Sequence, residues 1–139
     1  MNIKDHSGRS ALHHTVSGGF TETCQMLVSA GADVNIRDNS GSTPLHLALA
    51  SKQKNKKLEI CQILISGGAD VNAKDNIEDP PLHLAVLAVS DYGSGLEFVR
   101  LLIAAGADVN MTAGLFIERF YGGLQRMVGS EAFSFLEKP

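Results

Sequence analysis

Three histidines recur in one local setting and are the first candidates for chemistry. His13, His46 and His83 each close a block that reads Pro-Leu-His in the second and third copies and Ala-Leu-His in the first. Imidazoles repeated along a chain could ligate a metal ion or serve as general bases. A nucleophile–base pair would need a Ser, Cys or carboxylate beside each histidine, and none stands there at matching positions of the three copies. The pattern predicts no catalytic residue and no enzyme.

The two cysteines also occupy matching positions. Cys24 and Cys61 lie in Glu-Thr-Cys-Gln and Glu-Ile-Cys-Gln, and Val99 takes the position in a third such segment. A position that accepts Cys or Val is an apolar packing site. Equivalent positions in stacked units are roughly 10 Å apart, the spacing of packed helices, which is more than a disulfide tolerates. No Cys-x-x-Cys or paired Cys/His spacing is present. We therefore predict buried free thiols, no metal site and no cofactor; metal and redox roles are the alternatives.

The elements that must position these residues are themselves repeated. Gly-Ala-Asp-Val-Asn occurs at residues 31–35, 68–72 and 106–110, each time after a His-containing block and two apolar helical stretches. Self-similarity at a spacing in the thirties indicates stacked helical units that cannot bury their apolar faces alone. The combination resembles the ankyrin repeat, whose signature contains the Thr-Pro-Leu-His found at 43–46. The resemblance covers roughly residues 2–110.

The resemblance implies an all-α repeat solenoid of ankyrin-like helix-turn-helix units joined by β-hairpin loops. Three repeats then span about 2–34, 35–71 and 72–109, and residues 111–139 form degenerate C-terminal capping helices or a tail. It also implies that the three histidines bond to loop backbone and brace the hairpins. An apolar stripe at helical spacing supports a cap over residues 115–128; a segment that docks on a partner or is poorly ordered is the alternative.

Local chemistry predicts where the helices of one unit begin and end. Thr43 caps the first helix and Pro44 takes its first position, where a missing N–H costs nothing. Glycines 67 and 68 stop the second helix. Gly41 suits a turn with positive φ, but Glu78 replaces it in the third unit. The third hairpin is therefore predicted to bend differently.

The two ends of the array raise separate expectations. Residue 2 already aligns with a repeat junction, and no polar N-terminal cap is visible. Either the segment is cut from a longer array, which we favour, or a partner covers the exposed face. Repeats 2 and 3 also gain residues between their helices, which predicts a secondary loop patch. This patch comprises Lys52, Lys54, Lys56, Lys57 and Tyr92.

Charge and apolar content restrict the class of partner. The 139 residues carry a formal net charge of −3, which gives no electrostatic case for nucleic acid. No apolar run approaches the roughly 20 residues needed to span a bilayer, and the start has no signal-peptide region. We expect an intracellular protein, cytoplasmic and/or nuclear, without nucleic-acid binding, membrane insertion or a small-molecule substrate.

These observations predict a non-enzymatic protein–protein interaction module. Ankyrin-like domains bind through hairpin tips and the exposed side of the first helices, and each tip here carries a base before its Asp. The alternative is a targeting or autoinhibitory ankyrin domain excised from a larger enzyme, channel or ubiquitin-ligase adaptor. The residues expected to meet a protein partner are Lys4, His6, Ser7, Arg9, Arg37, Asn39, Ser40, Ser42, Lys74, Asn76, Ile77 and Asp79.

Three asparagines are candidates for modification. Asn35, Asn72 and Asn110 each follow Asp-Val, with a leucine eight residues earlier. This resembles the sites in ankyrin repeats that an iron- and 2-oxoglutarate-dependent asparaginyl hydroxylase modifies. The alternative is that each side chain only bonds across the hairpin backbone.

Overall fold

The described part of the chain forms six helices in three pairs. The computed structural model describes residues 2–51, 56–92 and 96–109. No strand occurs within these residues, so the hairpin loops between successive helix pairs consist of turns and irregular backbone. The helices are α1 (Ala11–Gly18), α2 (Thr21–Ser29), α3 (Pro44–Ala50), α4 (Lys57–Ser66), α5 (Pro81–Tyr92) and α6 (Leu96–Ala104). The predicted all-α repeat solenoid is confirmed.

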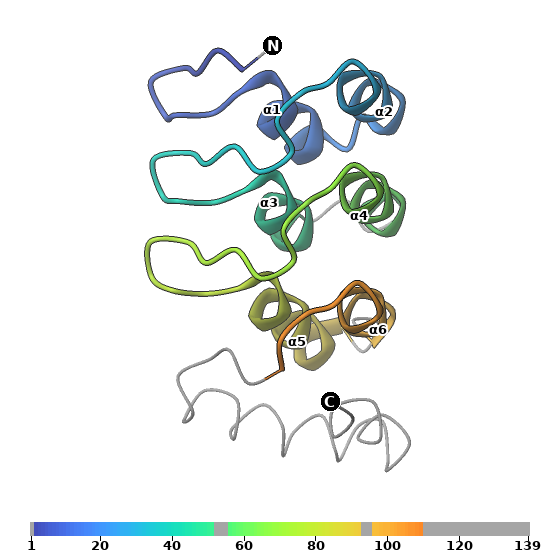
Figure 1. Ribbon diagram of the computed structural model, residues 1–139. Helices are drawn as coiled ribbons and strands as arrows, with labels where there is room; N and C mark the ends of the chain where they lie inside the picture. The colour runs from blue at the N-terminus through green and yellow to red at the C-terminus, as the bar shows by residue number, and fades with distance from the viewer. Residues whose placement is uncertain (1, 52–55, 93–95, 110–139) are drawn as a thin grey trace.

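The helix pairs stack into two parallel columns with the hairpin loops along one side (Figure 1). The inner column contains α1, α3 and α5, and the outer column contains α2, α4 and α6. Neighbours within each column pack on one another, as do the two helices of each pair. The three hairpins project from the inner column in the same direction, so that equivalent tip residues form a row.

The ends of α3 and α4 are set by local chemistry, as predicted. The Thr43 hydroxyl accepts the backbone N–H of His46 at 3.4 Å, and Pro44 occupies the first turn of α3. Beyond α4, Gly68 adopts φ 96°, a left-handed conformation that glycine enters without steric cost. The Ala69 N–H then donates to the Leu64 carbonyl at 3.0 Å, which closes the helix end.

The core is continuous through all three pairs. Leu12, Leu45, Leu64 and Leu102 have at most 1% of their surface exposed. Such a core explains why no single pair would be stable alone, because each pair covers the apolar face of its neighbour. Ile3, which precedes α1, is 84% exposed, whereas its equivalent Ile36 in the second unit is only 7% exposed.

The prediction that both cysteines are buried free thiols is confirmed. Cys24 and Cys61 are free and buried in the core. Burial raises the pKa of the Cys24 thiol to about 11 and that of the Cys61 thiol to about 12. Both groups are therefore protonated at neutral pH and poor nucleophiles.

The prediction that Tyr92 lies in a loop is wrong. Tyr92 is the last residue of α5, which has 12 residues against 7 in α3. The segment after His83 contains no Gly or Pro before residue 93, so the helix continues through most of the extra residues. The predicted cap at residues 111–139 lies outside the described residues, and the repeat boundaries stay predictions.

Candidate interaction site

Each hairpin is built around one aspartate. The Asp38 carboxylate accepts the backbone N–H groups of Ser40 and Ser42, both at 2.9 Å. The Gly41 N–H donates to the Asp38 carbonyl at 2.9 Å, and the Asp38 N–H donates to the Ser42 carbonyl at 3.0 Å. Asp5 organises the first hairpin through the same bonds. Because these bonds satisfy the turn backbone internally, the tip has a defined shape before any partner arrives.

The third hairpin has the same geometry as the other two, so the prediction that it bends differently is wrong. Asp75 accepts the N–H groups of Ile77 and Asp79 at 3.0 and 2.9 Å, and the Glu78 N–H donates to the Asp75 carbonyl at 3.0 Å. Glu78 adopts φ 64°, where Gly8 and Gly41 have φ 74°. The left-handed region costs a residue with a Cβ about 1–2 kcal/mol. The bonds to Asp75 therefore outweigh the local preference of Glu78.

Asparagines join each tip to the one before it. The Asn39 N–H donates to the Ser7 carbonyl at 3.0 Å, and its side-chain amide donates to the His6 carbonyl at 2.8 Å. Asn76 repeats both bonds, to Ser40 at 3.0 Å and to Asn39 at 2.9 Å. A Cβ on Gly41 would lie 2.4 Å from the Asn76 amide oxygen, so the close stacking itself requires glycine there. Asn39 and Asn76, expected to meet a partner, thus hold the row together.

Two of the three histidines brace the hairpins as the family resemblance implied. The Nδ1 of His46 accepts the Thr43 N–H at 3.2 Å, and its Nε2 lies 2.8 Å from the Asp79 carbonyl of the next hairpin. His13 has equivalent contacts with Ser10, at 3.1 Å, and with Ser42, at 2.9 Å. These contacts require the neutral tautomer with its proton on Nε2. Desolvation by burial lowers the pKa of His13 below 6.5, which favours this neutral form.

His83 has a different environment because of one substitution. Pro80 stands where the first two units have Ser10 and Thr43, and proline has no N–H to donate. The Nδ1 of His83 instead lies 2.9 Å from a carboxylate oxygen of Asp79. A carboxylate only accepts, so this contact places a proton on Nδ1. Asp79, expected to contact a partner, is thereby engaged inside the third unit.

The basic row at the hairpins is less uniform than expected. Lys4 and Arg37 are exposed and Lys74 is half-buried. The Arg37 guanidinium donates to the Lys74 carbonyl at 2.6 Å. Arg9 Nε lies 3.4 Å from the Asp38 carboxylate. Both arginines thus link adjacent hairpins, whereas the remaining exposed tip side chains project outward. These outward residues are Lys4, His6, Ser7, Ser40, Ile77 and Glu78, and Glu78 was not among the residues expected to meet a partner.

The structure describes the side chains of only two members of the secondary loop patch, Lys56 and Lys57. Lys57 is the first residue of α4, and its Nζ lies 5.2 Å from the centre of the Phe98 ring. Desolvation by burial lowers the pKa of Lys57. Lys57 therefore covers apolar surface between α4 and α6. Lys56 is exposed, and Lys52 and Lys54 lie outside the described residues.

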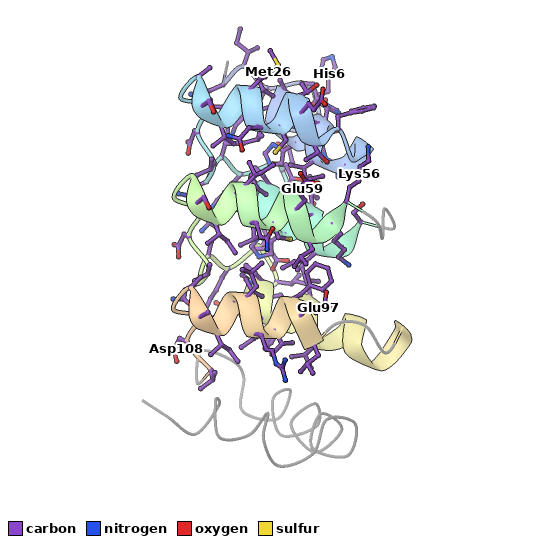
Figure 2. All side chains as sticks on the ribbon, turned by 90° about the vertical axis from the view of Figure 1, so that its right-hand side faces the viewer. His6, Met26, Lys56, Glu59, Glu97 and Asp108 are labelled. Atoms are coloured by element: carbon purple, nitrogen blue, oxygen red, sulfur yellow. The ribbon has the colours of Figure 1, made fainter. Side chains whose placement is uncertain are left out.

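The outer column carries a charge pattern that the sequence analysis did not single out. Glu22, Glu59 and Glu97 occupy the same position of α2, α4 and α6, and all three are exposed. Figure 2 looks onto the outer column, with Glu59 and Glu97 labelled. The signal was present in the repeat alignment, because each glutamate precedes a core position by two residues. Arg100 of α6 is also exposed, so the outer column carries charges of both signs, as the hairpins do.

Two general properties limit what this surface can do. Within the described part of the chain, no group of three or more His, Cys, Asp and Glu side chains could hold a metal ion. Among the same residues, no helix combines the length and apolarity needed to cross a bilayer.

Comparisons with known proteins agree with this architecture. A family model for ankyrin repeats in three copies matches residues 1–75, and one for a single ankyrin repeat matches residues 78–113. An ankyrin repeat protein of Acanthamoeba polyphaga mimivirus is 42% identical over 60 residues, which are 43% of this chain and 8% of that protein. Protein phosphatase 1 regulatory subunit 12A of Mus musculus is 52% identical over 42 residues, 30% of this chain and 4% of that protein. Protein phosphatase 1 regulatory subunit 27 of Homo sapiens is 50% identical over 42 residues, 30% of this chain and 27% of that protein.

Proposed function

Because the chain belongs to the ankyrin repeat family, whose members are generally protein-interaction modules, we propose that it binds a protein partner without catalysing a reaction. The contact surface is the row of hairpin tips together with the neighbouring exposed side of the first helices. The partner is a folded protein or a peptide segment, and neither nucleic acid nor a small-molecule substrate is involved.

The hydrogen bonds that link each hairpin tip to the next are the observation that carries this proposal. Each tip is bonded internally by its aspartate and externally to its neighbour by an asparagine, so the row is rigid across repeats. A surface that is already ordered loses little conformational entropy on binding. The exposed side chains on it are available at fixed positions, roughly 10 Å from one repeat to the next.

Site-specific photocrosslinking tests the location of this surface. A photoreactive phenylalanine derivative at Ser40 on the tip of the second hairpin is expected to form an adduct with a protein in extracts of the source cells. The matched control carries the same group at Gln62, an exposed residue of α4 in the outer column. Adducts from position 62 without any from position 40 would move the binding surface to the outer helices.

A second candidate is a targeting or autoinhibitory domain within a larger protein. The chain spans only 4–27% of the length of the relatives named above, which favours this arrangement. In that case the partner of the hairpin row is another domain of the same protein. The crosslinking experiment distinguishes the cases when it is repeated with the full-length protein, because the adduct is then intramolecular.

We also propose that Asn35, Asn72 and Asn110 are substrates of an asparaginyl hydroxylase. Asn35 donates to the Gly68 carbonyl at 3.2 Å and accepts the Asp70 N–H at 2.6 Å; Asn72 has the same bonds to Gly106 and Asp108. Hydroxylation requires these bonds to open, so modification is expected to be slow at both internal positions. Asn110 lies outside the described residues and precedes the degenerate segment, so it is the preferred site.

Mass spectrometry after incubation with such a hydroxylase, iron(II), oxygen and 2-oxoglutarate tests the proposal. We expect a gain of one oxygen, located at Asn110 by peptide mapping. An unchanged mass would show that the three asparagines serve only the hairpin backbone.

A further inference from the structure

The tip of the third hairpin departs from the other two at adjacent positions. The first two tips read Asp-His-Ser-Gly and Asp-Asn-Ser-Gly, and the third reads Asp75-Asn76-Ile77-Glu78. Ile77 is 77% exposed, although its equivalents are serines. A large apolar side chain exposed to water at the end of a rigid turn contributes no burial free energy to the fold. It contributes such free energy only when another surface covers it.

Glu78 shows a second departure that disfavours the fold. It holds the left-handed conformation that glycine provides in the other hairpins. The first two tips also require glycine for a steric reason. A Cβ on Gly8 would lie 2.7 Å from the backbone nitrogen of Asn39, and a Cβ on Gly41 would lie 2.7 Å from that of Asn76. No fourth Asp-x-x-Gly sequence follows Asn110. A residue kept in a strained conformation at a binding surface points to use of its side chain.

Charge along the row gives the chemistry of what this tip contacts. The first hairpin contains two bases and one acid, Lys4, Arg9 and Asp5, and the second contains Arg37 and Asp38. The third contains one base and three acids. Asp75 and Asp79 are engaged by backbone N–H groups and by His83, whereas Glu78 is exposed and forms no ion pair within the described residues. The net charge therefore falls from positive to negative across roughly 20 Å, two repeat spacings.

We propose that Ile77 and Glu78 determine which partner the hairpin row binds, and that they bind a lysine or arginine of the partner together with an adjacent large apolar side chain. This inference rests on the proposed interaction function and adds the partner's chemistry and orientation. The apolar group packs on Ile77, and the cation pairs with the Glu78 carboxylate at the rim of that contact. The opposite end of the partner's contact strip faces the more basic first hairpin.

The double variant Ile77→Ser with Glu78→Gly provides a sharp test, because it gives the third tip the sequence of the second. The variant is expected to melt several degrees higher than the wild type, since glycine removes the strain at position 78. Two displayed libraries of random peptides, about 12 residues long and thus able to span the row, are selected on the wild type and on the variant. Peptides enriched only on the wild type should contain a Lys or Arg next to a Leu, Ile or Phe.

The most enriched peptide is then synthesised and titrated calorimetrically. Its affinity should fall at least tenfold in the double variant, and several-fold in Glu78→Gln, which removes the charge and keeps the side chain. Adding Ser40→Ile to the double variant moves an apolar group to the second tip and should not restore binding.

Equal binding to wild type and double variant, enrichment of acidic peptides, or no wild-type-specific peptide would each contradict the proposed role of Ile77 and Glu78. Crosslinking from Ser40 does not depend on these residues. The crosslinking experiment therefore tests the proposed interaction function independently of the role of Ile77 and Glu78.

Discussion

Replacing Leu64 with alanine is expected to lower the free energy of unfolding by about 3 kcal/mol, in the range measured for buried Leu→Ala changes. Leu64 has 0% of its surface exposed and lies in α4, the outer helix of the central pair. It belongs to the core cluster that runs through all three pairs. The helices on both sides limit how far the cavity can collapse, so the cost includes both the lost transfer free energy and the unfilled space.

Thermal and urea unfolding followed by circular dichroism measure this effect. A loss of about 3 kcal/mol corresponds to a decrease of roughly 10 °C in the melting temperature of a domain of this size. Gln62→Ala is the matched control, because Gln62 is an exposed residue of the same helix. A Leu64→Ala protein that unfolds like this control would contradict a core shared between the pairs.

The second large effect is expected from His46→Ala, at about 2–3 kcal/mol. The substitution removes the acceptor of the buried Thr43 N–H and the donor to the Asp79 carbonyl. A buried polar group without a partner costs about 1–3 kcal/mol. The Asp79 carbonyl retains the Asp75 N–H as a donor at 3.2 Å, so the orphaned Thr43 N–H and the lost packing account for most of the penalty.

Hydrogen exchange distinguishes this bracing role from a general loss of stability. In the His46→Ala protein, the amides of Ile77 and Asp79 in the third hairpin should lose protection before those of α1. His6→Ala is the control, because His6 is exposed at the first tip, and such surface changes usually stay within about 0.5 kcal/mol. Uniform loss of protection across the chain would show that His46 does not specifically couple the second unit to the third hairpin.

Much of the fold could be predicted because its determinants are local and repeated. The stop at Gly68, the Thr43 cap and the Pro44 start depend on neighbours within one turn of helix. The same chemistry recurs in units of similar length, so the stacking of equivalent apolar faces follows from the repeat. The burial of Cys24 and Cys61 followed from their matching positions in two units.

The candidate site was predicted less well because its residues serve two purposes. Tip position alone assigned Arg37, Asn39 and Asn76 to a partner, yet their side chains bond to neighbouring hairpins. A single unit does not reveal these bonds, because the acceptor lies about one repeat away in the sequence. Lys57 was assigned to a surface loop for the same reason, since the Phe98 ring that it covers belongs to the next pair.

The sequence by itself determined the repeat family, the ends of the helices in the second unit and the burial of the two cysteines, because each depends on residue types at neighbouring or matching positions. Only the tertiary structure decided the shape of the third hairpin. Local preference disfavours Glu78 at φ 64°, but Asp75 bonds the turn and Asn76 ties it to the second tip. These hydrogen bonds together outweigh one unfavourable dihedral. The bonds to Asp75 are local to the third hairpin, whereas the Asn76 bonds to Ser40 and Asn39 form only when the second and third units stack.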